Sequence, residues 1–468
     1  METHLIRSIC HHPHALPPRA EHQLRYALNF ARLTSFEPGA AEKGGRTGRG
    51  DVEVIEEPLL HFRGQVMQML GETLRPGLLP ERRVREAARA LPRLMPLLKE
   101  ARESVLQHHA NDFTERELDA EVGKKTLVSV AGGGGGAGYV YIGAWEVLEA
   151  AGFIPGYIIG ASIGSVIGLF RARKRIGDYE ADIRLAKGIR PENVFRVVST
   201  RTRYGLPGLM RLFLHAAIDE RFRREDGSLL RLPDLEIPYE AVVAGVTKGA
   251  MPNTPDEYAR EHHLILTRRP GRLKMTRLIG EQLVRMVAFF NPMLVKEIVV
   301  GGDEMTSAFD AVDAAGFSAA IPGILHYDVA RNDPHMEGIL DALFAREELA
   351  CLVDGGVANN VPARTAWRQV QAGKIGTRNA YYLGFDCFHP QWSSGHVWLQ
   401  GITRIVQMQV ALNSPYAHHI VKFNPTLSPV NLVPPPRKMD AAVSWGREKM
   451  SHGIPAMKKF FERIEWVE

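Results

Sequence analysis

The sequence predicts an α/β protein, a sheet layered with helices, preceded by a helical region. From about residue 125, strand-like runs alternate with helical ones, which is typical of a layered α/β sheet. Two glycine-rich turns there each follow an apolar, β-branched run and precede a helical pattern. Before residue 125, apolar side chains recur at spacings of three and four, as in amphipathic helices.

Residues 1–124 are predicted to form the helical N-terminal region. A short helical stretch comes first, and residues 36–52, FEPGAAEKGGRTGRGDV, are polar and glycine-rich without periodicity, which predicts a flexible linker. The runs HFRGQVMQML and ERRVREAARALPRLMPLLKEARESVLQHH have helical spacing, interrupted by Pro92 and Pro96. Thr114 and Glu117 have the spacing of a capping box and predict one more short helix.

Residues 125–390 are predicted to be the catalytic domain, and residues 391–468 a C-terminal extension packed on it. Helices are expected at about 138–151 and directly after Ser162. Strands are expected at TLVSV, GYIIGA, YEAVVAGV, ACLVDGG and NAYYLGFD.

The glycine run AGGGGGAG ends the first of these strands and has three interpretations. Gly133, Gly135 and Gly138 match a dinucleotide-binding pattern, but the next strand ends beside Ser162 without the acidic residue that holds a ribose. A P-loop is excluded because no Gly-Lys-Ser/Thr follows. The third interpretation is that the N–H groups of Gly134 and Gly135 face the negative charge of an acyl-transfer intermediate. A flexible loop is the structural alternative.

The stretch YIIGASIGSVIG places Ser162 between Gly160 and Gly164. An apolar strand before the serine and a helix-compatible run after it are the context of a nucleophile elbow, which exposes a serine on a sharp turn. The spacing alone is a weak signal, but a second glycine turn at the same sheet edge strengthens it. We therefore expect Ser162 to be a nucleophile.

Two groups of residues are candidates for the base that takes the serine proton. An α/β-hydrolase triad would use Asp386 followed by one of five histidines: His389, His396, His418, His419 or His452. The alternative is Asp354, which ends a strand before the Gly355–Gly356 turn and would reach the serine at the carboxyl edge of a parallel sheet.

Four blocks, in this order, resemble the patatin-like phospholipases over about residues 126–386. They are GGGGAGYVYIGAWEVLEAAG, GASIGS, SAAIPGILHYDV and VDGGVANNVP. The resemblance implies a three-layer α/β/α fold with a mainly parallel central sheet. It also implies activity on the acyl esters of phospholipids and related lipids.

By this resemblance, Ser162 is the nucleophile and Asp354 its base in a Ser-Asp dyad that needs no histidine, cofactor or metal. Where the family usually has Arg or Lys in the glycine loop, this chain has Ala137, which leaves rate and head-group preference open. The resemblance places Gly133, Gly134 and Gly135 in the oxyanion hole and makes motif glycines of Gly138, Gly160, Gly164, Gly355 and Gly356.

Composition and charge restrict the partners. The chain has 468 residues, no run of about 18 apolar residues that could span a bilayer, and no apolar core of a secretory signal at its start. Its three cysteines lie far apart, which is typical of a reducing compartment. We therefore expect a cytoplasmic location, while nothing in the sequence opposes delivery into another cell. No oligomeric state is indicated.

A basic stretch is the candidate for contact with lipid. Residues 171–211 carry eleven Lys or Arg against four Asp or Glu, together with apolar residues from Leu206 to Leu214. They predict either a solvated helix face or a surface that binds anionic lipid. No nucleic-acid module is present, and the cluster CHHPH at Cys10 lacks a second half-site for a metal.

The sequence thus predicts a serine lipid acyl hydrolase of phospholipase A or lysophospholipase type that acts on an acyl-lipid substrate at a membrane surface. Two alternatives remain: a catalytically weak lipid-binding or scaffold protein on the same fold, or an esterase with a Ser-Asp-His triad.

Overall fold

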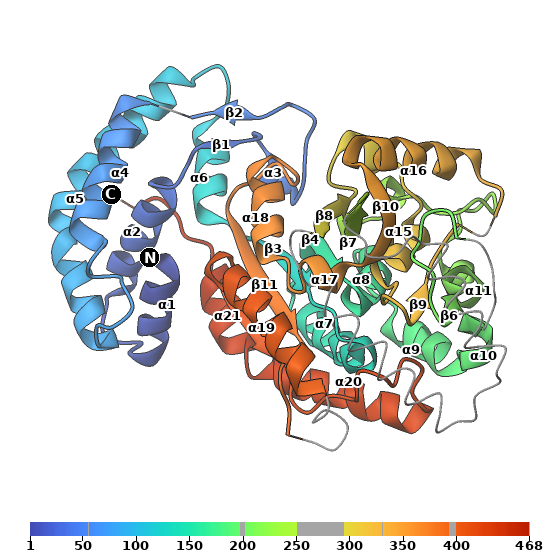
Figure 1. Cartoon of the computed structure of the whole chain (residues 1–468). Helices are drawn as coiled ribbons and strands as arrows, with labels where there is room; N and C mark the ends of the chain where they lie inside the picture. The colour runs from blue at the N-terminus through green and yellow to red at the C-terminus, as the bar shows by residue number, and fades with distance from the viewer. Residues whose placement is uncertain (55, 197–201, 250–293, 330, 393–398, 468) are drawn as a thin grey trace. The chain divides into compact units, whose positions relative to one another are not determined.

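The computed structural model describes residues 1–54, 56–196, 202–249, 294–329, 331–392 and 399–467 (Figure 1). Arg201 of the basic stretch and the candidate His396 lie outside the described residues. Among the described residues, none of the helices combines the length and the apolar character needed to cross a bilayer.

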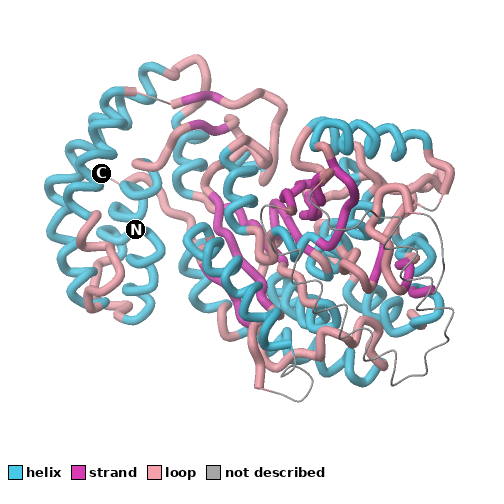
Figure 2. The backbone as a smooth tube through the Cα atoms, viewed as in Figure 1, coloured by secondary structure: helices cyan, strands magenta, loops and turns pink. Residues whose placement is uncertain are grey.

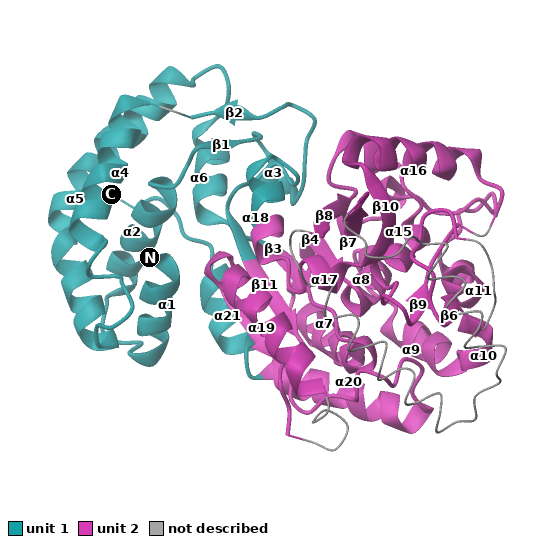
Figure 3. Ribbon diagram, in the orientation of Figure 1, with its two compact units in different colours: residues 1–127, 367–381, 452–468 teal, residues 128–366, 382–451 magenta. Residues whose placement is uncertain are grey.

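The chain divides into two compact units (Figure 3), each built from more than one segment. Unit 1 consists of Met1–Leu127, Trp367–Tyr381 and His452–Glu468, and unit 2 of Val128–Ala366 and Tyr382–Ser451. One boundary between the units lies after Leu127, and the expected boundary lies at residue 124. However, the last residues of the chain belong to unit 1, so residues 391–468 are not a single extension of the catalytic domain.

Unit 1 is mainly helical, as predicted. Its buried core is formed by apolar faces such as Val84, Leu91, Leu98 and Val105 of the longest helix. The elements assigned to it are α1 (Glu2–His11), α2 (Pro18–Phe30), β1 (Ser35–Phe36), α3 (Ala40–Lys43), β2 (Val52–Glu53), α4 (Glu57–Leu70), α5 (Pro80–His108), α6 (Glu115–Gly123) and α21 (Ile454–Phe461).

Two details of unit 1 differ from the prediction. Helix α5 continues through Pro92 and Pro96, which lie on its exposed side, where the carbonyl groups they leave unpaired can turn towards water. The predicted linker 36–52 contains α3 and pairs β1 with β2. Its buried Glu37 side chain accepts hydrogen bonds from the N–H of Thr47 at 2.8 Å and of Arg49 at 2.9 Å, which closes the glycine-rich segment on itself.

The predicted capping box is present in unit 1: Thr114 and Glu117 form it at the start of α6.

Unit 2 contains most of the large sheet, and Figure 2 shows its strands running among helices. The strands are β3 (Thr126–Ala131), β4 (Pro155–Ala161), β5 (Phe195–Arg196), β6 (Met210–Leu212), β7 (Tyr239–Thr247), β8 (Val295–Val300), β9 (Leu325–His326), β10 (Leu349–Asp354), β11 (Ala380–Asp386) and β12 (His419–Lys422). The helices are η1 (Gly135–Tyr139), α7 (Val140–Ala150), α8 (Ile163–Ala172), α9 (Tyr179–Gly188), α10 (Pro191–Val194), α11 (Leu214–Ile218), η2 (Asp219–Arg221), η3 (Leu232–Asp234), α14 (Glu304–Ser307), α15 (Ala311–Ser318), α16 (Pro334–Glu347), α17 (Gly355–Ala358), α19 (Gln400–Asn413), η6 (Ser414–Tyr416) and α20 (Pro436–Ser451). Helix α18 (Ala363–Gln371) begins in unit 2 and ends in unit 1.

The main sheet has the order β10-β7-β4-β3-β11-β12, with β8 also paired to β7. Strand β4 runs parallel to β7, and β11 runs parallel to β12, whereas β8 and β10 are antiparallel to β7. Helices α8 and α15 pack on β7, and α20 packs along α7. The predicted α/β/α architecture with a mainly parallel central sheet is confirmed.

Candidate active site

Ser162 lies at the sharp turn between β4 and α8, as the sequence predicts. Its backbone has φ 55° and ψ −129°, a left-handed conformation that residues other than glycine rarely adopt. Its N–H donates to Ser318 Oγ at 2.9 Å, and Ser318 Oγ donates to the carbonyl of Val242 at 2.6 Å. The end of α15 therefore ties the strained turn to strand β7.

The motif glycines around this turn are required by close packing. A Cβ at Gly160 would lie 2.6 Å from the backbone of Gly164, and a Cβ at Gly164 would lie 2.3 Å from the carbonyl oxygen of Ala131. A Cβ at Gly138 would lie 2.5 Å from the side chain of Ile163. Because these positions carry no side chain, the glycine loop, β4 and α8 can approach one another closely.

Asp354 reaches Ser162 by a route that differs from the predicted one. We expected β10 to be a parallel strand whose carboxyl end meets the same sheet edge, but β10 is antiparallel to β7. Val242 and Val243 of β7 both pair with β8 on one edge. On the other edge, Val242 pairs with Ala161 of β4 and Val243 pairs with Asp354 of β10. The strands β4 and β10 therefore run towards each other along one edge of β7, and their ends meet there.

This meeting of strand ends brings Ser162 and Asp354 into direct contact. Ser162 Oγ donates a hydrogen bond of 2.6 Å to Asp354 Oδ2, and both residues are buried. The N–H of Gly356 donates to Asp354 Oδ1 at 2.8 Å and orients the carboxyl group. A Cβ at Gly355 would lie 1.8 Å from the carbonyl oxygen of Val242, so the chain can turn there only at a glycine.

Burial raises the pKa of the Asp354 carboxyl from its ordinary value of 3.8 to about 7, although the hydrogen bonds from Ser162 and Gly356 act in the opposite direction. A carboxyl group with a pKa near neutrality can accept and return a proton under physiological conditions.

The described residues contain no histidine that is hydrogen-bonded to Ser162 or Asp354. Asp386, the acid of the predicted triad, accepts hydrogen bonds from the Gln407 side chain and the N–H of Phe388. His389 is bonded to the carbonyl groups of Pro390 and Phe423. The geometry therefore favours the dyad interpretation over the triad.

The N–H groups of the glycine loop differ in whether they form hydrogen bonds within the protein. The N–H of Gly133 donates to the side-chain oxygen of Asn360, so Gly133 holds the loop in place and does not present its N–H to a substrate. The N–H groups of Gly134 and Gly135 have no hydrogen-bond partner among the described residues. Gly134 has φ 155° and Gly135 has φ 53°, conformations that suit glycine. Gly133, expected in the oxyanion hole, therefore has no free N–H for it, whereas the N–H groups of Gly134 and Gly135 stay candidates.

Sequence reasoning missed Ser318 and Asn360. Each lies inside one of the four blocks quoted above, at the start of SAAIP and within VANNVP. Their contacts depend on the folded backbone, and no spacing in the sequence distinguishes these two residues from the other polar residues of the same blocks.

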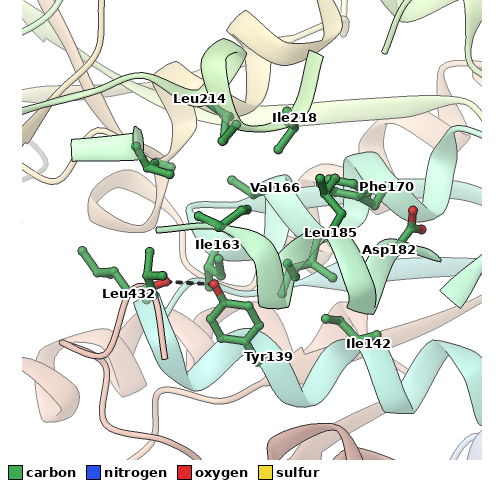
Figure 4. Close-up of a pocket in the computed structure, with 18 of the residues that line it drawn as sticks. Tyr139, Ile142, Ile163, Val166, Phe170, Asp182, Leu185, Leu214, Ile218 and Leu432 are labelled. Atoms are coloured by element: carbon green, nitrogen blue, oxygen red, sulfur yellow. Dashed lines mark hydrogen bonds between the residues drawn. The ribbon is translucent and has the colours of Figure 1, made fainter. Parts of the chain in front are cut away.

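Two cavities open at Ser162. The first cavity occupies about 1160 Å³, its open mouth included, and extends along α8 and α9 past apolar side chains such as Val166, Phe170, Leu185 and Leu214 (Figure 4). The second cavity occupies about 890 Å³, again with its mouth, and lies beside the glycine loop, Asp354 and α19.

A group of three side chains outside these cavities has the composition of a metal site: His215, Asp310 and Asp313. The Arg331 guanidinium contacts Asp313 at 2.7 Å and Asp310 at 3.4 Å. Burial lowers the pKa of His215, but hydrogen bonds to Asp219 and Asp313 outweigh it and raise the pKa to about 9. In this structure His215, Asp310, Asp313 and Arg331 form an ion-pair network. The residues of the CHHPH cluster are exposed at the end of α1.

The basic stretch 171–211 differs from the predicted amphipathic surface. Its apolar residues Leu206, Leu209 and Leu214 are buried in the protein, and Arg173 is paired with Asp182 at 3.5 Å. Its exposed residues include the short loop Lys174-Arg175-Ile176 between α8 and α9, and also the separate arginines Arg184, Arg190, Arg196 and Arg203.

A family model described as "Patatin-like phospholipase" matches residues 129–367. This range contains the glycine loop, the turn at Ser162, Ser318, and the strand that ends at Asp354. A search of curated proteins finds no match for the chain.

Proposed function

The chain belongs to the patatin-like phospholipase family, a family of lipid acyl hydrolases, and on that premise we propose that it cleaves the acyl esters of phospholipids with a Ser162–Asp354 dyad. The observation that carries the proposal is the 2.6 Å hydrogen bond from Ser162 Oγ to Asp354 Oδ2 at a strained turn. The reaction type is that of phospholipase A or lysophospholipase.

In the first step, Ser162 Oγ attacks the carbonyl carbon of the ester while its proton passes to Asp354 Oδ2. The negative charge that develops on the carbonyl oxygen is stabilised by the N–H groups of Gly134 and Gly135. When the C–O bond of the ester breaks, the leaving alcohol takes the proton from Asp354, and the acyl group remains on Ser162.

In the second step, a water molecule gives its proton to Asp354 and attacks the acyl carbon. The same glycine N–H groups stabilise the second intermediate. The fatty acid leaves as Asp354 returns the proton to Ser162 Oγ. After the two steps Ser162 again carries its proton and Asp354 is again ionised, and no cofactor is used.

The test is hydrolysis of p-nitrophenyl butyrate together with labelling by a fluorophosphonate. We expect the native protein to hydrolyse the ester, the Ser162→Ala variant to lose this activity, and mass spectrometry to locate the phosphonate adduct on Ser162. An adduct elsewhere, or turnover that survives in Ser162→Ala, would contradict the proposal.

Ala137 favours a second candidate function. Where the family usually has Arg or Lys, this buried alanine supplies no charge, so a lipid-binding protein of low activity on the same fold is the alternative. Binding of phospholipid vesicles without ester hydrolysis or fluorophosphonate labelling would support it.

A further inference from the structure

The two cavities at Ser162 have only a few lining residues in common. Both are lined by Gly135, Ser162, Ile321 and Leu432, and their other walls differ. The first cavity runs along α8 and α9, and the second lies between the glycine loop and α19. A substrate whose ester carbonyl is at Ser162 can therefore extend in two directions.

Asp354 distinguishes the two directions. It lines the second cavity and not the first. In the proposed mechanism the leaving alcohol takes its proton from Asp354, so the alcohol part of the ester must lie on the side of the second cavity. The acyl chain that is transferred to Ser162 then occupies the first cavity.

The first cavity has the properties of a site for one acyl chain. Most of its wall is aliphatic or aromatic, and at the far end Arg171 is paired with Glu149 at 2.9 Å and Asp182 with Arg221 at 2.9 Å. These ion pairs use the charged groups of that part of the wall, so no charged side chain there is left to repel an acyl chain.

The second cavity is unexpectedly apolar for a site that holds an alcohol. Its wall includes Ile402 and Val406 of α19 with Val357 and Phe388, and its described lining residues include no Lys, Arg or His. Its polar side chains, Ser162, Asp354 and Asn360, already serve the dyad and the glycine loop. A phosphate or a bare glycerol would lose its hydration there without gaining a partner, which is unfavourable.

We propose that the second cavity binds the second acyl chain of a diacyl glycerolipid, so that this enzyme prefers diacyl lipids to their monoacyl counterparts. The inference rests on the proposed function and specifies its substrate class. The leaving alcohol is then a lysolipid, whose remaining chain stays in the second cavity while its head group faces the solvent.

The experiment compares two cavity-filling variants on three substrates. Ile402→Trp fills the second cavity from α19, and Leu185→Trp fills the first cavity from α9. The substrates are a diacyl phosphatidylcholine, the matching lysophosphatidylcholine and p-nitrophenyl palmitate. The last has a long acyl chain but a small leaving group that does not need the second cavity.

We expect native kcat/KM to favour the diacyl lipid over the lysolipid by about tenfold or more. Ile402→Trp should lower kcat/KM for the diacyl lipid by about tenfold or more and leave p-nitrophenyl palmitate within about twofold. Leu185→Trp should lower kcat/KM for both of these substrates. If Ile402→Trp fails to fold, Val406→Phe extends into the second cavity from the same helix with a side chain smaller than tryptophan.

A native preference for the lysolipid, or an equal loss on both substrates in folded Ile402→Trp, would overturn the cavity assignment. Fluorophosphonate labelling of Ser162 distinguishes a failure of this inference from a failure of the proposed function. A labelled serine with the wrong substrate preference overturns this inference alone, whereas an unlabelled serine with no turnover overturns the proposed function.

Discussion

In the proposed mechanism, Ser162 is activated only when the carboxyl group of Asp354 is ionised. Burial raises the pKa of this group to about 7. We therefore expect kcat/KM for p-nitrophenyl butyrate to rise about tenfold per pH unit below about pH 7 and to level off above it. The measurement is a pH–rate profile on folded protein. A profile that is flat from about pH 5 to pH 8 would contradict Asp354 as the base.

The same carboxyl group should reduce the stability of the folded protein when it is charged. Its pKa is raised on folding from 3.8 to about 7, so the folded state holds this proton more tightly than the unfolded state. That contribution to stability is complete below about pH 4 and is lost as the pH rises through about 7. Asp354→Asn removes the buried charge.

We therefore predict that Asp354→Asn abolishes hydrolysis and raises the free energy of unfolding at pH 8, by at most about 4 kcal/mol. The gain should be smaller at pH 5, where the native carboxyl group is protonated. Urea unfolding at both pH values measures the difference. A loss of stability at pH 8 would show that the hydrogen bond to Ser162 outweighs the cost of burying the charge.

Part of the site could be predicted residue by residue. Ser162 and Asp354 are recognisable because each ends an apolar strand and precedes glycines or a helix. The roles of Ser318 and Asn360, and the loss of the Gly133 N–H to Asn360, could not be predicted, because they depend on side-chain contacts between segments far apart in the sequence.

At the scale of elements, the turn from β4 into α8 depends on glycines that leave no room for a side chain. We predict that Gly160→Ala lowers the free energy of unfolding by about 2 kcal/mol or more, because its Cβ would lie 2.6 Å from the backbone of Gly164. Gly188→Ala, at the end of α9, is the matched control. Its Cβ would meet nothing within 4 Å, so it should raise stability by about 0.5–1 kcal/mol.

Urea unfolding of the two glycine variants gives both values, and p-nitrophenyl butyrate hydrolysis gives the effect on the site. We expect activity to be lost in Gly160→Ala and kept in Gly188→Ala. Equal stability of the two variants would mean that the backbone at β4 can shift without cost.

Strand positions were easier to predict than strand directions. The expected strands β3, β4, β7, β10 and β11 are present, because each is a short apolar run bounded by glycine or polar residues. The direction of β10 could not be predicted, since an apolar run reads the same for parallel and antiparallel pairing. β8 was missed because Lys296 and Glu297 interrupt its apolar pattern.

At the scale of the whole molecule, residues at the end of the chain complete unit 1. Phe460 and Ile464 are buried, and the Arg25 guanidinium donates to the carbonyl groups of Phe460 and Glu462, each at 3.2 Å. No local pattern in the sequence indicates such a return of the chain. The expected division into three consecutive regions therefore does not include this return.

The whole molecule must also reach its lipid, and we propose peripheral binding through the exposed loop Lys174-Arg175-Ile176. Ile176 is 71% exposed, and the neighbouring Arg171 and Gly177 line the first cavity. Lys174→Glu/Arg175→Glu should lower binding to vesicles rich in anionic lipid and lower activity on them, while p-nitrophenyl butyrate hydrolysis is kept. Arg173 is left unchanged because it pairs with Asp182.

The control for vesicle binding is Arg437→Glu/Lys438→Glu, the same change of charge at exposed positions of α20. Cosedimentation at low and physiological salt measures binding, which should weaken as the screening length shortens to about 8 Å. An equal loss in both double variants would show that net charge, and not this loop, controls vesicle binding.

The meeting of β4 and β10 on one edge of β7 also means that the reaction centre can be divided between two polypeptides. The exposed turn at Gly227, where a Cβ would meet nothing within 4 Å, separates Ser162 from the segment that carries both β7 and Asp354. A chain cut at this turn would leave the nucleophile on one fragment and the base on the other. Ester hydrolysis would then require the fragments to pair along β7, so the enzyme could serve as a two-part reporter of protein association.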